Sequence, residues 1–176
     1  MLPSHLPGGE LISRSGPTLF INPRGVLHPR WAGDFNPPEG VPAPPRFCWS
    51  EPLRPVAERW NLRLVLRTSD MFNMPFESVK SLAPPWLASR IVDRTADVWR
   101  YIGWDEPRKV DSAYNVTRKY VEAHEIQHWV ALDHADDGWP HKDEVRKHLV
   151  CCNVELGLTE VPALASLEKA LIACRP

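Results

Sequence analysis

The sequence predicts a three-layer α/β fold in which an open, mostly parallel sheet of five strands is covered by helices on both faces. Short apolar runs alternate with helical patterns along the chain, which favours parallel strands joined by crossover helices. The run WVALD at 129–133 is apolar up to its last residue, as expected of a strand buried on both faces. The 176 residues contain no internal repeat and no linker, so we expect a single domain spanning residues 1–176.

Five segments have the composition of β-strands. The first is rich in residues that favour strands and is ended by Pro23 and Gly25. In chain order, the predicted strands are TLFIN (18–22), LRLVLRT (62–68), RIVDRT (90–95), WVALD (129–133) and HLVCCNV (148–154). Sites in open parallel sheets form at the carboxyl ends of the strands. We therefore expect functional residues directly after these segments.

Helical patterns occupy the intervals between the first three strands. One helix begins near Ser50, with prolines in its first turns, where they are tolerated. Its apolar face comprises Leu53, Val56, Ala57 and Trp60. The stretch PFESVKSLAPPWLASR then predicts a helix that ends near Pro84-Pro85, followed by a short turn of helix.

Two further helices are predicted in the second half of the chain. The first follows an unassigned stretch, and its spaced residues are Val116, Tyr120, Val121 and His124. The second closes the chain, with Thr159 as a plausible N-cap. Its apolar stripe comprises Val161, Leu164, Leu167, Leu171 and Ile172.

Composition excludes several classes of protein. A hydrophobic content of 43% and a charged content of 24% indicate a soluble globular protein. The net charge of -1 gives no electrostatic signal for nucleic acid or for an anionic membrane. The first residues lack the pattern of a signal peptide, and no segment reaches membrane-spanning length. The four cysteines are therefore expected to be reduced thiols in the cytoplasm.

The proline-rich segment 35–55 is expected to form an ordered, largely extended loop or surface excursion within the domain. Tryptophans are also frequent, and four of the eight lie in segments that contain proline or glycine. These are Trp31, Trp49, Trp104 and Trp139. Loop tryptophans usually pack locally, but a cluster of them beside the proline-rich segment would offer a surface for a protein partner.

The letters of a zinc-protease motif, H-E-x-x-H, occur at His124-Glu125-Ile126-Gln127-His128. That motif requires both histidines on one helix, whereas the helical pattern reaches only His124 and His128 opens the WVALD strand. The longer protease pattern wants glycine at Ala131 and a methionine downstream, but all three methionines lie upstream. A chance match across a helix–loop–strand junction is the favoured interpretation. A zinc metallohydrolase using His124, Glu125 and His128 remains the least favoured alternative.

Several segments, in this order and spacing, resemble the haloacid dehalogenase (HAD) superfamily. TLFINPRGVLHP resembles its first motif, in which a strand ends in D-x-D followed by Gly-Val-Leu. NLRLVLRTSDMF is similar to the second strand with its Ser/Thr-rich end, and HWVALDHADD to the fourth strand with its acidic motif. SVKSLAPPWLASRIVDRT and LVCCNVELGLTEVPALASLEKAL resemble the remaining elements of a small, minimally capped bacterial subgroup related to domains of RNA-repair proteins. The resemblance implies a Rossmann-like sheet.

The resemblance also implies a chemistry whose residues are altered here. A carboxylate that attacks phosphorus would stand at Asn22, and the acid/base carboxylate would stand at Arg24. An amide does not form an acyl phosphate at a useful rate, and a guanidinium is no general acid at neutral pH. The phosphate-binding lysine has no clear counterpart, since Lys109 and Lys119 are both displaced from the expected position. Asp133, with Asp136 and Asp137, could still hold Mg²⁺.

We therefore expect a HAD-fold pseudoenzyme in which the Arg24 guanidinium takes the place of the metal and pairs with the remaining acids. Such a protein could bind a phosphate or nucleotide through residues at adjacent strand ends, or it could bind another protein. The candidate phosphate-binding residues are Arg24, Arg67, Thr68 and Ser69. The alternative is an active HAD-type phosphatase with altered Mg²⁺-dependent chemistry, in which the Asn22 amide oxygen ligates the metal and water is the nucleophile.

Overall fold

Five parallel strands form the centre of the molecule in a computed structural model, which describes residues 16–30, 32, 39–40, 42–67, 74–95, 99–100, 108–109, 111–136 and 138–176. In spatial order the strands are β3 (Ile91–Arg94), β2 (Arg63–Leu66), β1 (Thr18–Ile21), β6 (Trp129–Asp133) and β7 (Leu149–Cys151). All four pairings are parallel. The predicted three-layer α/β fold with five strands is confirmed, and each strand lies within the segment predicted for it.

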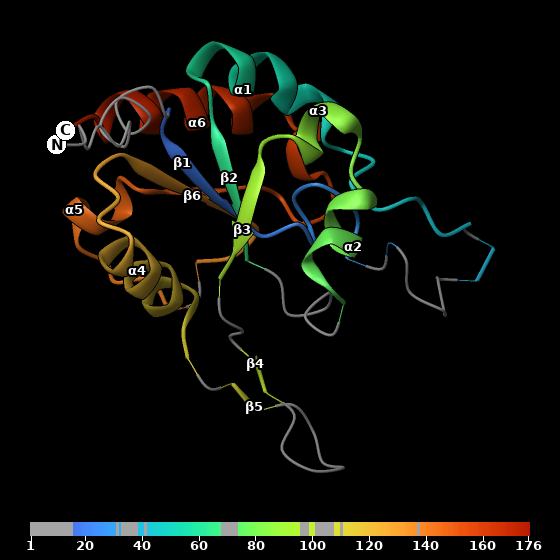
Figure 1. Cartoon of the computed structure of the whole chain (residues 1–176), viewed down its shortest axis with the longest axis horizontal. Helices are drawn as coiled ribbons and strands as arrows, with labels where there is room; N and C mark the ends of the chain where they lie inside the picture. The colour runs from blue at the N-terminus through green and yellow to red at the C-terminus, as the bar shows by residue number, and fades with distance from the viewer. Residues whose placement is uncertain are drawn as a thin grey trace, which may run out of the picture.

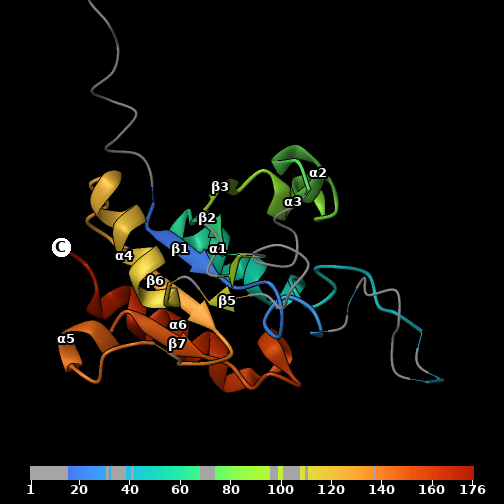
Figure 2. The same ribbon diagram turned by 90° about the horizontal axis from the view of Figure 1, so that it is seen from below.

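Helices cover both faces of this sheet. The helices α1 (Arg54–Trp60) and α6 (Val161–Ala173) lie together on one face, and α4 (Ala113–Ala123) lies on the other (Figure 1). Two short helices, α2 (Phe76–Ser81) and α3 (Pro85–Ala88), lie together near the β3 edge (Figure 2). The remaining helical segments are η1 (Glu51–Leu53), α5 (Asp143–Arg146) and η2 (Gly157–Thr159). None of the described helices is long and apolar enough to cross a membrane.

The alternation of side chains along β1 creates a separate core on each face. Leu19 and Ile21 are fully buried in the larger core, which includes side chains of α1 and α6. Phe20, between them, belongs to the smaller core, where its ring contacts Tyr120 of α4 and Trp129 edge-on. Both faces of β1 are therefore buried, which explains why Leu19 to Ile21 form a continuous apolar run.

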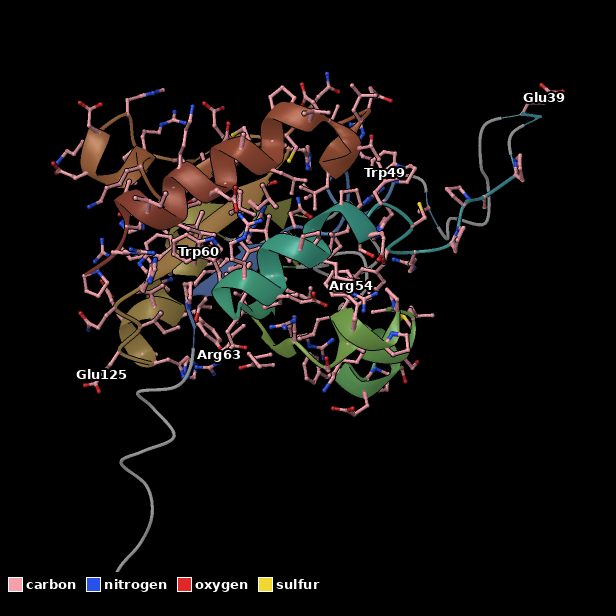
Figure 3. The ribbon with its side chains drawn as sticks, turned by 90° about the horizontal axis from the view of Figure 1, so that it is seen from above. Glu39, Trp49, Arg54, Trp60, Arg63 and Glu125 are labelled. Atoms are coloured by element: carbon pink, nitrogen blue, oxygen red, sulfur yellow. The ribbon has the colours of Figure 1, made fainter. Side chains whose placement is uncertain are left out.

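The connection from α1 to β2 is very short. The helix is capped by Asn61, whose left-handed backbone (φ 50°) turns the chain so that the N–H of Leu62 donates to the Ala57 carbonyl at 2.9 Å. Two residues later the chain enters β2, and this confirms the helix predicted from Ser50. Helical structure therefore begins inside the proline-rich segment, whose described earlier part, at residues 39–40 and 42–49, consists of turns and irregular backbone. Figure 3 shows Glu39 far from the helices that cover the sheet.

The closing helix forms as predicted, but its cap and its buried face differ. Thr159 lies in η2, and the N-cap is Glu160, which makes no side-chain capping bond. Val161 is 83% exposed and Ile172 is 57% exposed, so neither belongs to the apolar stripe. The buried residues are Ala163, Leu167, Ala170 and Leu171. At about 100° per residue, Val161 and Ile172 lie on the side of the helix opposite the buried Ala163.

The stretch that the sequence left unassigned contains a short antiparallel pair of strands. These are β4 (Trp99–Arg100) and β5 (Arg108–Lys109), and they lie apart from the five-stranded sheet (Figure 1). Trp139 is 3% exposed and packs beside Trp129 in the smaller core, so it is not part of a partner surface. Trp31 and Trp104 lie outside the described residues.

Candidate functional site

The carboxyl ends of three neighbouring strands bring the candidate residues together. Ile21 of β1 pairs with Leu66 of β2 on one side and with Leu132 of β6 on the other. The residues that follow these three positions are Asn22, Arg67 and Asp133. They therefore meet at one edge of the sheet, as the sequence predicts for sites in parallel sheets.

The Asp133 carboxylate is the centre of this cluster and is almost completely buried, with 5% of its side chain exposed. Its Oδ1 accepts hydrogen bonds from Asn22 Nδ2 (3.0 Å) and from the backbone N–H of His134 (2.8 Å). Its Oδ2 forms an ion pair with Arg67 Nη2. Both carboxylate oxygens are therefore engaged by the protein itself, which is the condition for keeping a charge in the interior.

Arg67 is the cation of this buried pair, with 14% of its side chain exposed. Burial lowers the pKa of Arg67 to about 10, because desolvation disfavours its charged form. The guanidinium therefore remains charged at neutral pH. Two opposite charges have been taken out of water together, and each one makes the burial of the other tolerable.

The prediction that Arg24 pairs with Asp133 is wrong. Among the described residues, the ion pair on Asp133 comes from Arg67, and Arg24 Nε instead donates to the backbone carbonyl of Arg30 at 2.8 Å. The physical reason is the tight turn after β1, in which three successive N–H groups, of Val26, Leu27 and His28, bond to the Pro23 carbonyl. Arg24 is carried into that turn, whereas Arg67 directly follows its strand.

His134, the residue after Asp133, lies against Asn22. Asn22 Nδ2 is 3.2 Å from His134 Nδ1, so the ring nitrogen is placed to accept from the amide. Burial lowers the pKa of His134, and the positive charges of Arg67, Arg30 and Arg24 lower it further, whereas a hydrogen bond from the ring to the backbone carbonyl of Arg24 raises it. The imidazole is therefore neutral at pH 7, and three guanidinium groups lie within electrostatic range of it.

Gly25 closes the turn after β1 onto this histidine. Its backbone is left-handed (φ 71°), and a Cβ atom there would lie 2.9 Å from Val154 Cγ2 and 3.1 Å from His134 Cγ. Only glycine combines that backbone with so close an approach.

His28, three residues later, is fully buried, and its Nδ1 accepts from the N–H of Phe47 at 3.1 Å. This bond ties the loop after β1 to the segment at Phe47.

The other predicted site residues do not join Asp133 within the part of the chain that is described. Asp136 is paired with Arg146, with both Nη atoms at 3.0 Å from its Oδ2. Lys119 Nζ is bound to Asp111 at 2.7 Å, so it does not replace the missing phosphate-binding lysine. Thr68, Ser69 and Asp137 lie outside the described residues.

The described residues do not fit a Mg²⁺ site of the kind that the HAD resemblance implies. Mg²⁺ requires an octahedral set of oxygen ligands. Here the Asn22 amide turns its NH₂ group to Asp133, and the carboxylate already carries the Arg67 cation. In the described ranges, no group of three or more His, Cys, Asp or Glu side chains is placed to hold a metal ion.

The H-E-x-x-H letters do not form one helical face, as predicted. Helix α4 ends at Ala123, and Glu125 has a left-handed backbone (φ 51°) that breaks the helix. The His124 ring packs on Tyr120 with ring centroids 4.0 Å apart. His128 instead opens β6, where its Nε2 is 2.8 Å from the Leu171 carbonyl of α6. The two imidazoles therefore belong to different surroundings and do not converge on a metal.

Sequence reasoning missed two features of the site. It placed Arg67 among phosphate ligands and did not predict its pairing with Asp133, although the order of the strands in the sheet puts both beside Asn22. It also gave no role to Arg30, because a loop residue carries no periodic signal. The position of Arg30 depends on the turn that brings its carbonyl to Arg24.

Comparison with known protein families agrees with this geometry. The chain matches the family described as the HAD domain in Swiss Army Knife RNA repair proteins over residues 18–163, a range that begins with β1, includes all five strands of the sheet and ends in the first turn of α6. No curated protein and no solved structure matches the sequence. The match covers most of the chain and contains Asn22, Arg67 and Asp133. The chain therefore belongs to the family of HAD domains in Swiss Army Knife RNA repair proteins.

Proposed function

We propose that this domain is a pseudoenzyme that retains the HAD fold without the aspartyl-phosphate chemistry of active relatives. Two substitutions support the proposal. Asn22 stands where a nucleophilic carboxylate is needed, and an amide nitrogen or oxygen does not form an acyl phosphate at a useful rate. Arg24 stands where a general acid is needed, and a guanidinium does not release its proton at neutral pH.

The ion pair between Arg67 and Asp133 is the observation that carries the proposal. A carboxylate that held a metal in an active enzyme would be left as an unpaired buried charge once the metal was lost. Arg67 supplies a permanent internal cation to Asp133. A divalent cation would have to displace a guanidinium that the protein already holds in a buried position.

Hydrolysis of p-nitrophenyl phosphate tests the loss of catalysis. We expect the purified protein to give the same rate in MgCl₂ as in EDTA. The alternative, an active hydrolase in which the Asn22 amide oxygen ligates the metal and water attacks, predicts Mg²⁺-dependent hydrolysis. Such activity, if it disappeared in Asp133→Asn, would overturn the proposal.

We further propose that the strand-end site binds a phosphate-containing anion. The supporting observation is that Arg24, Arg30 and Arg67 all act electrostatically on His134. The described carboxylates nearby are Asp133, which is paired with Arg67, and Glu155, which lies 3.9 Å from Arg30 and is mostly exposed. Among the described residues around His134, arginines therefore outnumber carboxylates, which favours an anion over a cation.

Thermal unfolding in phosphate tests this second part. At equal ionic strength, we expect sodium phosphate to raise Tm more than sodium chloride does, because a ligand that binds only the native state stabilises it. Arg24→Gln and Arg30→Gln should reduce the difference. Arg59→Gln is the matched control, because Arg59 is an exposed arginine of α1 that pairs with Glu168. Equal Tm values in the two salts would contradict the proposed anion site.

A further inference from the structure

A cavity of about 220 Å³ opens between the loop after β1 and the loop after β7. It combines an aromatic ring, a cation, an anion and two apolar side chains. The lining residues are Pro29, Arg30, Trp49, Val154 and Glu155. The volume is below the roughly 300–1,000 Å³ of most small-molecule sites, so the cavity suits one ring system and not a large ligand.

The indole of Trp49 is fixed in place by the backbone around it. The backbone N–H of Trp49 donates to the Leu27 carbonyl at 2.8 Å, which ties this residue to the loop after β1. Gly157 lies against the ring, since a Cβ atom on this residue would be 2.5 Å from Trp49 Cε3 and 2.5 Å from the Val26 carbonyl oxygen. The absence of a side chain at Gly157 therefore lets the indole pack against backbone, while the ring also lines the cavity.

The cavity adjoins the strand-end site. Val154, which lines the cavity, and His134, which contacts Asn22, both lie against Gly25. Arg30 also lines the cavity, and its backbone carbonyl accepts a hydrogen bond from Arg24 Nε. One glycine therefore separates the aromatic cavity from the arginine-rich end of the sheet. A ligand with a flat ring and an attached phosphate could occupy both places together.

We propose that the cavity binds the base of a nucleoside phosphate, with the ring stacked on Trp49 and the phosphate held near Arg30 and Arg24. This inference rests on the proposed anion site and extends it to a class of ligand. Bases stack on aromatic side chains whatever their identity, and arginine binds phosphate oxygens. The Arg30–Glu155 pair does not close the cavity, because its atoms are 3.9 Å apart and both side chains are more than half exposed.

A series of ligands separates the contribution of the base to binding from that of the phosphate. Adenosine 5′-monophosphate, ribose 5-phosphate, inorganic phosphate and adenosine are titrated into the full chain, with dissociation constants measured by calorimetry at one fixed salt concentration. Ribose 5-phosphate carries the anion without the base. We expect the adenosine monophosphate to bind roughly 5- to 150-fold more tightly than ribose 5-phosphate, the range that corresponds to about 1–3 kcal/mol for one stacked base.

Variants at Trp49 assign this difference to the indole. Trp49→Phe keeps an aromatic face and should preserve most of the advantage of the base, whereas Trp49→Leu keeps apolar volume and should abolish it. Trp86→Leu is the matched control, because Trp86 is a partly buried tryptophan of α3 outside the cavity. A short 5′-phosphorylated oligonucleotide that competes at least as well as the monophosphate would identify an RNA end as the source of the same chemistry.

The results distinguish failure of this inference from failure of the anion site. Equal affinity for adenosine monophosphate and ribose 5-phosphate would overturn the base-binding cavity and leave the anion site standing. An advantage of the base that survives in Trp49→Leu would also overturn it. Binding of adenosine that depends on Trp49, without measurable binding of inorganic phosphate or ribose 5-phosphate, would support the cavity and remove the anion site.

Discussion

Arg67, at the end of β2, reaches past the end of β1 to form a buried ion pair with Asp133 at the end of β6. The pair spans the position of Asn22, whose amide donates to the same carboxylate. An acid that the HAD resemblance assigns to metal binding is therefore held by two side chains from neighbouring strands and by one backbone N–H.

Removal of either partner should destabilise the fold. In Asp133→Asn the Arg67 charge remains buried without its counter-ion, and we expect the free energy of unfolding to fall by about 3 kcal/mol. In the double variant Asp133→Asn/Arg67→Met no charge is left unpaired, so the two losses should not add, and the coupling free energy should be about 2 kcal/mol. Urea denaturation of the four proteins measures this cycle.

The ion pair between Asp136 and Arg146 is the matched control for that cycle. Asp136 is 59% exposed, and Asp136→Asn should change the free energy of unfolding by no more than about 0.5 kcal/mol. Additive losses at Asp133 and Arg67 would show that the two side chains are not coupled in solution.

His134 should make stability depend on pH. Burial lowers the pKa of His134 below its ordinary value of 6.5, so below pH 6.5 the unfolded state binds more protons than the folded state. The free energy of unfolding should therefore fall as the pH falls through this window. Burial also lowers the pKa of His148, so His134→Gln should reduce this slope without removing it.

Denaturation midpoints between about pH 8 and pH 5 measure this slope. His141→Gln, at an exposed histidine, serves as the control for the loss of an imidazole. A slope below pH 6.5 that is as steep in His134→Gln as in the wild type would contradict the assignment. Phosphate should flatten the slope in the wild type, because an anion beside His134 favours the protonated ring.

Gly25 and Gly40 allow the cost of close packing to be separated from the cost of backbone strain. Both have a left-handed backbone, with φ of 71° and 78°, but a Cβ atom on Gly40 would meet nothing within 4 Å. Gly40→Ala should therefore cost only the left-handed conformation, about 1–2 kcal/mol. Gly25→Ala should cost about 1–3 kcal/mol more, because its Cβ would press against Val154 and His134. Equal losses in denaturation experiments would contradict the tight closure of this loop.

The central strands β1 and β6 were predictable from the sequence because they are buried on both faces. The apolar runs 19–21 and 129–132 have no polar position that could suggest another structure. The exposed residues of α6 were less predictable. Val161 and Ile172 are apolar but exposed, so composition alone assigned them to a stripe that alanines complete instead.

The identity of the site was predictable, but its internal pairing was not. Strand ends placed Asn22, Arg67 and Asp133 together, since residues that follow adjacent parallel strands must meet. Which arginine reaches the carboxylate depends on the turn after β1, and this turn is set by hydrogen bonds to Pro23 that leave no mark in the spacing of residues. The sequence therefore favoured Arg24, the residue that replaces the family's second carboxylate.

Calorimetric titration with MgCl₂ tests the central claim most directly, because it asks whether the internal cation excludes the metal. The wild-type protein should show no saturable binding across the millimolar range. The variant Asn22→Asp/Arg67→Ser places a second carboxylate beside Asp133 and removes the cation, so it should bind Mg²⁺ saturably while circular dichroism shows that it remains folded. Saturable Mg²⁺ binding by the wild type that is lost in Asp133→Asn would contradict the account.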